Sequence, residues 1–246
     1  MRAGLLLCAA VALLWLADSL RTRDVRDTAL ANSPTVTVGD DGIVLAFLPA
    51  QAQGRTGLIF ICGSAVDAEA YASLLRPVAE AGYPVFIVNL PYRIAPLESH
   101  RPIVFDRVRQ VIADNPGVAA WVVSGHSLGA ALAARFAGAQ AASLSGMVLI
   151  ATTHPQAEDL SQLQIPVTKI YATNDGLAAA DKVLANKAKL PAHTRWVEIE
   201  GGNHAQFGRH IEPLADGEAT ISHAEQEALT RSAIIRLLDE VDKAAP

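Results

Sequence analysis

The chain has 246 residues, of which 51% are hydrophobic and 18% are charged, and its formal net charge is -5 at pH 7. A chain this apolar can bury a substantial core, which excludes intrinsic disorder, and its acidic balance argues against a nucleic-acid-binding protein. Its two cysteines, Cys8 and Cys62, are too few for a disulfide framework or a zinc site built on thiolates.

The first thirty residues predict a leader or a membrane anchor. Residues 4–17 read GLLLCAAVALLWLA, an uncharged run that is shorter than the about 20 residues of a membrane-spanning helix but suits a secretory signal. Arg21, Arg23 and Arg26 follow, and positive charge on that side disfavours outward transfer. An ordinary helix packed on the domain is the alternative. We expect residues 1–30 to export the protein or to tether it, facing outside the cytoplasm.

From about residue 35 onward, short apolar runs alternate with helical patterns. Strands are expected at Ile43–Leu48, Leu58–Ile61, Val85–Asn89, Trp121–Ser124, Met147–Ala151, Val167–Ala172 and Trp196–Ile199. Helices are expected at Ala68–Ala81, Ile103–Asp114, Leu128–Gln140 and Ala178–Leu190, and a last helix begins with a capping box at Ser222. Continuous apolar strands are typical of a sheet covered on both faces. The pattern predicts one α/β domain over residues 35–246, with a mostly parallel sheet flanked by helices.

The segment GHSLG at residues 125–129 stands between an apolar strand and an alanine-rich helix. A serine at the tip of such a sharp turn adopts a strained backbone, and the strand and the helix then approach too closely for side chains two residues on either side. Gly125 and Gly129 remove those side chains. The turn also places Ser127 at a helix N-terminus, where free N–H groups favour developing negative charge. Ser127 is the predicted nucleophile; a tight glycine turn without chemistry is the alternative.

A carboxylate and an imidazole follow two later strands. Asp175 comes just after one apolar strand and His204 just after the next, which completes the chain order expected for this type of nucleophile. A serine hydroxyl needs a neutral imidazole to take its proton, and a carboxylate on the other ring nitrogen stabilises the imidazolium that forms. Each residue alone would be a loop or turn residue. Together they predict a triad, with Asp181 and Glu158 as alternative acids that do not directly follow a strand.

The segment CGSA, which begins at Cys62, follows another apolar strand. A tetrahedral intermediate requires two N–H donors preset where negative charge develops. Leu128, next to the predicted nucleophile, is expected to supply one donor and Ser64 the other, with Ala65 as the next candidate. Gly63 would let the backbone bend close to the site, although a plain strand-ending turn is the alternative. Cys62 is expected to be a small core residue.

With these residues in place, the chain resembles the α/β-hydrolase superfamily over roughly residues 40–240. The segments EGGNHAQFG at 200–208, GEATIS at 217–222 and DAEAY at 67–71 are similar to a bacterial branch related to dienelactone hydrolases. The resemblance implies the triad above and ester-like substrates. The chain departs from the superfamily in having Cys62 where a histidine is common, and from true dienelactone hydrolases in having a serine nucleophile in place of cysteine.

The connection between the strand that ends at Ala151 and the one that begins near Val167 is too short for a lid domain. An open or shallow site without a lid argues against a long-chain triglyceride lipase. The candidate substrate-wall residues are Tyr92, Arg93, His154 and Phe207. Arg93 would be able to bind a carboxylate, but an arginine in a salt bridge is the simpler interpretation. His204 and His210 lack a paired acidic ligand pattern, so no metal site is expected.

These features predict a serine hydrolase that cleaves small acyl esters, lactones or thioesters through an acyl-enzyme. The expected partner is a small-molecule acyl substrate, without a cofactor, a metal ion or a nucleic acid. A serine at position 127 excludes a dehalogenase or epoxide hydrolase with an aspartate nucleophile. The alternatives are a non-catalytic tethered binding protein on the same fold and an acyltransferase that uses the same triad.

Overall fold

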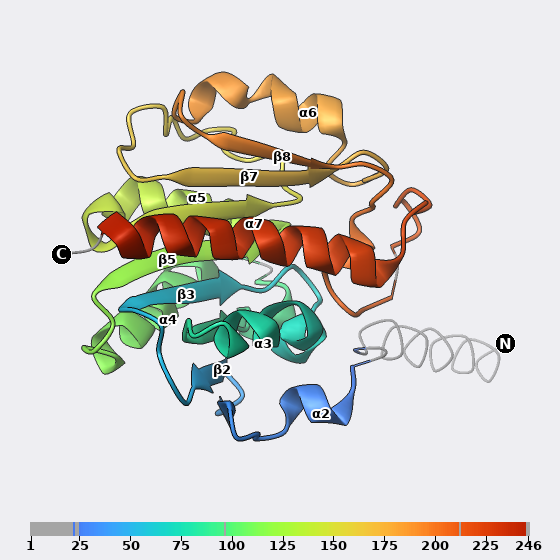
Figure 1. Ribbon diagram of the computed structural model, residues 1–246. Coiled ribbons are helices and arrows are strands. Elements are labelled where there is room, and N and C mark those ends of the chain that lie inside the picture. The colour runs from blue at the N-terminus through green and yellow to red at the C-terminus, as the bar shows by residue number, and fades with distance from the viewer. Residues whose placement is uncertain (1–21, 23–24, 96, 212, 245–246) are drawn as a thin grey trace, which may run out of the picture.

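The computed structural model describes residue 22 and residues 25–95, 97–211 and 213–244. Within these residues, an eight-stranded sheet is covered by helices on both faces (Figure 1). The strands are β1 Val36–Asp40, β2 Val44–Pro49, β3 Thr56–Ile61, β4 Val85–Val88, β5 Ala120–His126, β6 Gly146–Ile150, β7 Val167–Ala172 and β8 Arg195–Ile199.

The sheet has the order β1-β2-β4-β3-β5-β6-β7-β8, in which β3 to β8 run parallel and β2 runs antiparallel to β1 and β4. The β1–β2 hairpin turns at Gly42, whose φ of 79° favours glycine. The Asp41 carboxylate accepts the N–H groups of Ile43 (2.8 Å) and Val44 (2.7 Å) in this turn. The carboxyl ends of all the parallel strands meet at one edge, the place where α/β proteins bind their ligands.

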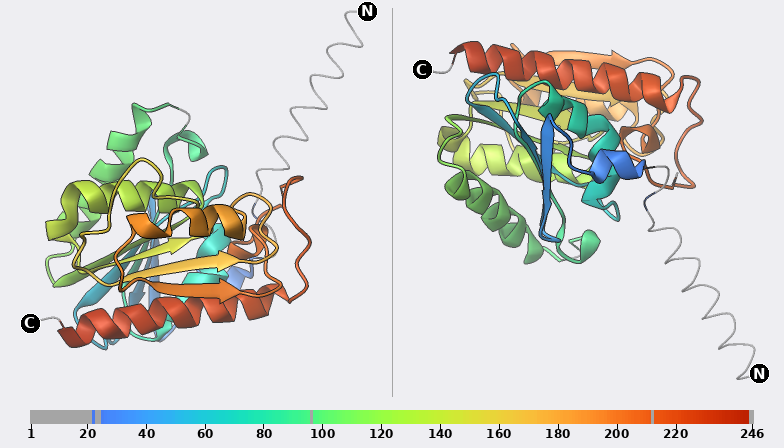
Figure 2. Two further views of the ribbon diagram at one scale, coloured as in Figure 1. Left: turned by 90° about the horizontal axis from the view of Figure 1, so that it is seen from above. Right: turned by 60° about the horizontal axis from the view of Figure 1, so that its bottom comes forward.

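The helices are α2 Asp27–Leu30, α3 Ala72–Glu80, α4 His100–Asp114, α5 Leu128–Gln140, α6 Ala180–Ala185 and α7 His223–Ala244. Short 3₁₀ turns lie at Ala68–Tyr71, Pro91–Arg93, Ala141–Ser143, Lys187–Lys189 and Ala205–Phe207. One hydrophobic cluster joins the sheet to α3 and α7, and a second joins its other face to α4 and α5. Figure 2 shows this layering, with the red α7 on one side of the sheet and the green α4 and α5 on the other.

The predicted fold class is confirmed, and the differences from the predicted elements are local. The sequence does not predict β1, because this edge strand buries a single residue, Val36, and therefore lacks an apolar pattern. The predicted helix 68–81 begins as a 3₁₀ turn and becomes α-helical only at Ala72. The predicted helix 178–190 is interrupted at Asn186, which ends α6 before a 3₁₀ turn.

The predicted leader, residues 1–30, falls largely outside the described residues, and so does its apolar run at 4–17. Its last part is described: Val25, Ala29 and Leu30 pack against the core near α3. The folded part of the chain therefore begins well before residue 35. Within the described residues, no helix combines the length and apolar character needed to cross a membrane.

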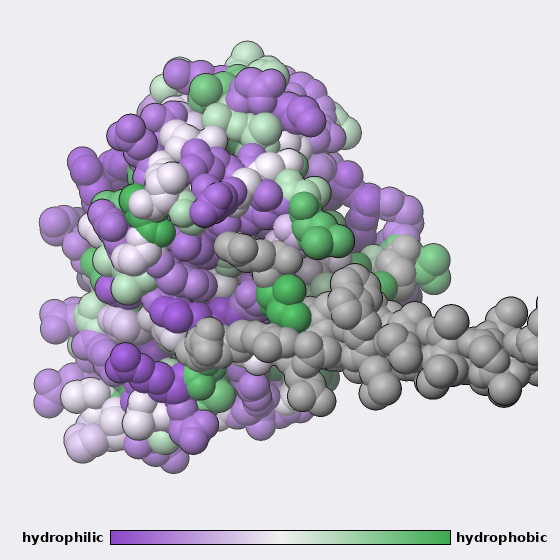
Figure 3. Space-filling view, turned by 90° about the vertical axis from the view of Figure 1, so that its right-hand side faces the viewer, coloured by the Kyte–Doolittle hydropathy of each residue, from purple (hydrophilic) through white to green (hydrophobic). Residues whose placement is uncertain are grey.

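The connection from β6 to β7 forms no lid. Residues 151–166 link the two strands without a helix or strand of their own. Figure 3 looks onto the carboxyl edge of the sheet, where the visible hydrophobic residues lie in small groups among hydrophilic ones. The edge that carries the candidate site is thus not covered by an inserted domain from this connection.

Candidate active site

Ser127 lies at the turn between β5 and α5. Its backbone has φ 54° and ψ -117°, a conformation that residues other than glycine rarely adopt. Its N–H donates to the Ile150 carbonyl on β6 (2.9 Å), which fixes the turn to the neighbouring strand. A Cβ on Gly125 would lie 2.4 Å from the carbonyl carbon of Gly129, and a Cβ on Gly129 would lie 2.0 Å from the carbonyl oxygen of Ile61. Strand and helix therefore cross too closely for any side chain at these positions.

An imidazole and a carboxylate meet beside this turn. His204 Nδ1 lies 2.9 Å from Asp175 Oδ2, and their side chains are 5% and 0% exposed. Asp175 Oδ1 accepts the N–H groups of Leu177 (2.8 Å) and Ala178 (2.6 Å). These bonds fix the Asp175 carboxylate beside the imidazole. His204 Nδ1 is therefore engaged, and Nε2 remains for a reacting group.

Asp216 joins the loops that carry the candidate acid and the candidate base, a role that no motif in the sequence predicts. Its Oδ1 accepts the N–H groups of Gly176 (3.1 Å), His204 (3.2 Å) and Gly217 (2.9 Å), and its Oδ2 accepts that of Ala205 (2.8 Å). A carboxylate that accepts several backbone N–H groups makes charge-assisted bonds, which are stronger than neutral ones. The only sequence signal is its place directly before the segment GEATIS.

The loop after β3 leaves one amide available. The Gly63 N–H donates to the Tyr71 hydroxyl (3.0 Å), and the Ala65 N–H donates to the Arg93 carbonyl (2.8 Å). The Ser64 N–H has no acceptor among the described residues. Of the two candidates for the loop donor, the geometry therefore favours Ser64 over Ala65.

The second candidate donor is Leu128, the first residue of α5. The first N–H groups of a helix have no partner within the helix, so this amide is free to bind an anion at the nucleophile turn. Ser127, Leu128 and His204 line one pocket of about 190 Å³, together with Ala131, Ala151, Thr152, Thr153, His154, Leu177 and Ala178. The pocket is small, and its wall beyond the reacting groups is mostly apolar.

Of the four residues predicted to line the substrate site, one lines the pocket beside Ser127. His154 lines the pocket. Phe207 does not, because it is 1% exposed and packs in the core against His126, so its prediction as a wall residue is wrong. Tyr92 is 78% exposed and lies outside the pocket. Arg93 forms a salt bridge with Asp67 (2.7 Å), the simpler of its two interpretations.

The remaining candidates do not reach the pocket. Glu158 pairs with Arg135 (2.8 Å), and Asp181 lies exposed in the first turn of α6, so neither alternative acid contacts His204. Cys62 is buried with its Sγ 3.7 Å from the Asn89 Oδ1, and burial raises the pKa of its thiol. Across the described residues, no group of three or more histidine, cysteine or acidic side chains is placed to hold a metal ion.

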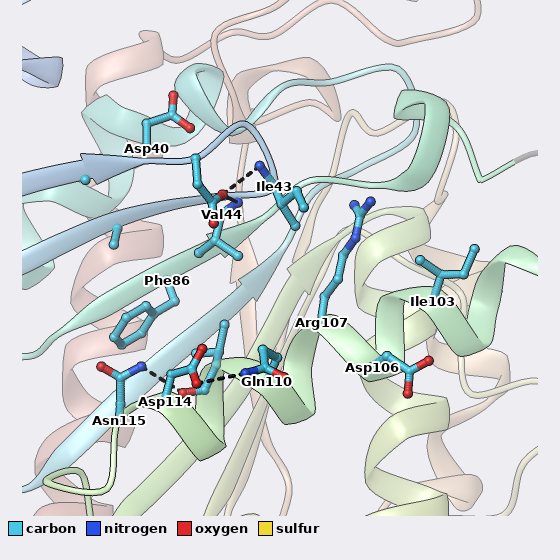
Figure 4. A pocket seen from close by; sticks show the side chains of 14 residues that line it. Asp40, Ile43, Val44, Phe86, Ile103, Asp106, Arg107, Gln110, Asp114 and Asn115 are labelled. Carbon is cyan, nitrogen blue, oxygen red and sulfur yellow. Dashed lines mark hydrogen bonds between the residues drawn. The ribbon is translucent and has the colours of Figure 1, made fainter.

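A larger cavity of about 590 Å³ lies between β2 and α4 (Figure 4). Val44 and Phe86 form part of its apolar floor, and Arg107 and Asp106 stand at its rim. The triad residues are not part of its lining. Its acids are engaged locally, as Asp106 is with Arg109. This cavity is separate from the pocket beside Ser127.

The sequence matches the alpha/beta hydrolase family over residues 57–228, more than half of the chain. The chain therefore belongs to the alpha/beta hydrolase family, and its class is that of a hydrolase. The superfamily resemblance is confirmed, whereas the relation to dienelactone hydrolases stays a prediction. No curated protein matches the chain.

Three solved structures illustrate the shared fold. A CIB-like hydrolase from Thermoplasma acidophilum is 12% identical with a TM-score of 0.64, and the match covers 82% of this chain and 99% of that one. A thermophilic esterase from Thermogutta terrifontis is 13% identical with a TM-score of 0.63, over 86% of this chain and 100% of that one. An α/β serine hydrolase without lid from Xanthomonas campestris is 14% identical with a TM-score of 0.59, over 83% and 96%.

Proposed function

We propose that this protein is a serine hydrolase that cleaves small acyl esters, lactones or thioesters through an acyl-enzyme. The observation that carries the proposal is the His204–Asp175 bond at 2.9 Å beside a serine in a strained strand-to-helix turn. A buried, oriented imidazole next to a hydroxyl is what nucleophilic acyl transfer requires. A binding protein has no need of all three groups.

In the proposed reaction, Ser127 Oγ attacks the carbonyl carbon of the substrate while His204 Nε2 takes the hydroxyl proton. Asp175 stabilises the imidazolium that forms, and the Leu128 and Ser64 amides bind the oxyanion. The intermediate collapses when the bond to the leaving alcohol or thiol breaks, and His204 gives that group its proton. Water then attacks the acyl-enzyme by the same steps and releases the acid, which regenerates Ser127.

The size of the pocket supports a small acyl group. A volume of about 190 Å³ lies below the range typical of sites for drug-sized ligands. The mostly apolar wall, with Leu128, Ala131 and Leu177, suits a short hydrocarbon chain rather than a charged one. The absence of a lid in the 151–166 connection leaves the acyl-enzyme open to water, which favours hydrolysis over acyl transfer.

A fluorophosphonate probe tests the proposal directly, because it phosphonylates only an activated serine. We expect one adduct, on Ser127 by mass spectrometry, together with hydrolysis of p-nitrophenyl acetate. Both signals should be lost in Ser127→Ala and in His204→Ala, while Ser143→Ala, a variant at a surface serine, should keep both. Undiminished labelling or turnover in folded Ser127→Ala would overturn the proposal, as would a folded wild-type protein that neither labels nor turns over.

We also propose that the apolar run at residues 4–17 exports or tethers the enzyme. The support is the sequence alone, since the run lies outside the described residues. Bacterial cells that express the full chain should retain it in the membrane fraction or release it from the cytoplasm. Recovery of all the uncleaved protein in the soluble cytoplasmic fraction would contradict this proposal.

A further inference from the structure

A buried tyrosine connects the two sides of the candidate oxyanion hole. The Tyr71 hydroxyl accepts the N–H of Gly63 (3.0 Å) and lies 3.0 Å from Nδ1 of His126. Gly63 directly precedes Ser64, whose amide is the candidate loop donor, and His126 directly precedes Ser127. One hydroxyl therefore joins the loop after β3 to the nucleophile turn through a continuous chain of hydrogen bonds.

The direction of these bonds follows from the donors present. Because the tyrosine oxygen already accepts the Gly63 N–H, its own proton is available for the unprotonated Nδ1 of a neutral His126. The other ring nitrogen, Nε2, then carries the hydrogen and is buried without a hydrogen-bond partner among the described residues. The chain thus runs from the loop after β3 through the Tyr71 hydroxyl to His126, the residue that precedes Ser127.

Both side chains are held uncharged, which keeps these bond directions fixed. Tyr71 and His126 are fully buried. Burial raises the pKa of the Tyr71 hydroxyl well above its ordinary value. Burial, together with the nearby His204 and His210, holds the pKa of the His126 imidazole well below its ordinary value.

The loop after β3 and the core both pack closely around Tyr71 and His126. A Cβ on Gly63 would lie 2.9 Å from His126 Nδ1 and 3.0 Å from the Tyr71 hydroxyl oxygen. Glycine at this position therefore allows the loop to approach both atoms closely. The Tyr71 ring also packs on Phe60 of β3, with ring centroids 4.7 Å apart. Its hydroxyl is therefore aimed by the core itself.

We infer that Tyr71 and His126 are positioning residues that set the Ser64 amide relative to Ser127. The inference rests on the proposed function. Preset donors stabilise the oxyanion of the transition state because they need no reorganisation during the reaction. Without the tyrosine hydroxyl, the Gly63 amide would lose its acceptor, and the loop would lose one of the hydrogen bonds that fix its orientation, the one directly beside Ser64. The result would be a poorer oxyanion hole in an otherwise intact protein.

Tyr71→Phe removes this hydroxyl and keeps the ring. We expect kcat for p-nitrophenyl acetate to fall about 10-fold or more, with KM nearly unchanged, because the loss concerns the transition state. Tyr83→Phe is the matched control: its hydroxyl bonds to Asp239 (2.5 Å), outside the pocket, so this variant should keep the wild-type kcat. Equal kcat values in folded Tyr71→Phe and Tyr83→Phe would overturn the inference.

Two substitutions at His126 that resemble each other in shape, but not in polarity, test the other half of the chain. An asparagine can present its carbonyl oxygen near the position of Nδ1, whereas a leucine has no acceptor. We expect His126→Asn to keep several-fold more of the wild-type kcat than His126→Leu. The double variant Tyr71→Phe/His126→Leu should be no slower than the slower single variant, because both changes break one chain. A double variant whose fold-loss in kcat equals the product of the two single losses would contradict the inference that Tyr71 and His126 act as one chain.

A measurement without substrate separates this inference from the proposed function. Amide hydrogen exchange at Gly63, followed by NMR, should be faster in Tyr71→Phe than in the wild type and unchanged in Tyr83→Phe. If the wild type hydrolyses no ester, the proposed function fails, and the exchange rates still show whether Tyr71 holds the loop. If the wild type is active but Tyr71→Phe changes neither kcat nor the exchange rate of the Gly63 amide, only the positioning inference fails.

Discussion

Asp216 shows how one side chain can hold an acid and a base in register. Its carboxylate accepts four backbone N–H groups, which belong to the loop of Asp175 and to the loop of His204. The two loops also touch directly: a Cβ on Gly176 would lie 2.1 Å from the Ala215 carbonyl oxygen, and a Cβ on Gly217 would lie 2.1 Å from the Asn174 carbonyl oxygen. We therefore expect the spacing of the candidate acid and the candidate base to depend on Asp216, a residue with no chemical role of its own.

Replacing Asp216 by alanine should therefore affect activity and stability together. The four amides would lose their shared acceptor, and we expect a stability loss of about 2–3 kcal/mol and a fall in kcat of about 10-fold or more. Asp41→Ala is the control, because Asp41 also accepts two backbone N–H groups but lies in the β1–β2 turn. Urea unfolding and ester kinetics measure both effects. A wild-type kcat in Asp216→Ala would show that the two loops position themselves.

At the scale of elements, the crossing of β3 with α5 decides whether the nucleophile turn can form. A Cβ on Gly129 would lie 2.0 Å from the carbonyl oxygen of Ile61 and 2.4 Å from that of Cys62, both of which are backbone atoms. Backbone cannot move aside as the end of a flexible side chain can. The helix would have to shift away from the sheet, and Ser127 with it.

Gly129→Ala should consequently destabilise the protein by about 3 kcal/mol or more, at the upper end of what overpacking costs. Gly39→Ala is the matched change, because a Cβ at Gly39 on the edge strand β1 meets no atom within 4 Å. The comparison uses the urea midpoints of the two variants at one pH. Equal midpoints would mean that α5 can move without cost.

Strand β7 carries a buried lysine, Lys169. Lys169 on β7 is fully buried, with its Nζ 2.5 Å from the His154 carbonyl oxygen, and burial lowers its pKa to about 7. In the unfolded chain this amine keeps its ordinary, higher pKa. Between pH 7 and pH 10 the unfolded state therefore binds more protons than the folded state, and stability rises with pH in this window.

This linkage can be measured by removing the amine. Relative to Lys169→Met, the wild type should gain up to about 1.4 kcal/mol of stability for each pH unit between 7 and 9, and no further change should occur below about pH 6. Lys182→Met, on the exposed side of α6, should show no such slope. Parallel curves for the wild type and Lys169→Met would mean that the buried amine keeps its proton through this range.

At the scale of the whole molecule, the short connection between β6 and β7 determines access to the site. Enzymes with a lid must open it before a large substrate can enter. Here residues 151–166 form an irregular connection that contributes pocket residues such as Thr153 and His154 and no helical cap. Substrate would approach from the carboxyl edge of the sheet, the face seen in Figure 3.

The rate of tributyrin hydrolysis should therefore rise smoothly to saturation and show no step where the substrate exceeds its solubility. An enzyme that must first open a lid at an interface would show such a step. A series of p-nitrophenyl esters provides the companion measurement, with kcat/KM expected to fall steeply from butyrate to palmitate because the pocket holds about 190 Å³. A preference for palmitate would contradict the small-acyl assignment.

Much of the fold could be predicted because its signals are local. The apolar runs of the inner strands are continuous, so β7 and α5 have the bounds that the sequence predicts. Glycine at 125 and 129 marks the turn because sterics at a sharp crossing leave few other choices. The prediction missed the edge of the sheet. Strand β1 buries only one residue, so its sequence has little alternation of apolar and polar residues.

The candidate chemical groups and their order can be recognised from the sequence: a serine in a sharp turn, and a carboxylate and an imidazole after later strands. The neighbours that hold these groups become visible only in the folded chain. Asp216, Tyr71 and His126 make contacts between segments far apart in the chain, and no local pattern encodes such a contact. For the same reason, the sequence does not show that Phe207 lies in the core or that the Ser64 N–H has no acceptor among the described residues. Burial and hydrogen bonding depend on how the loops meet in the folded chain.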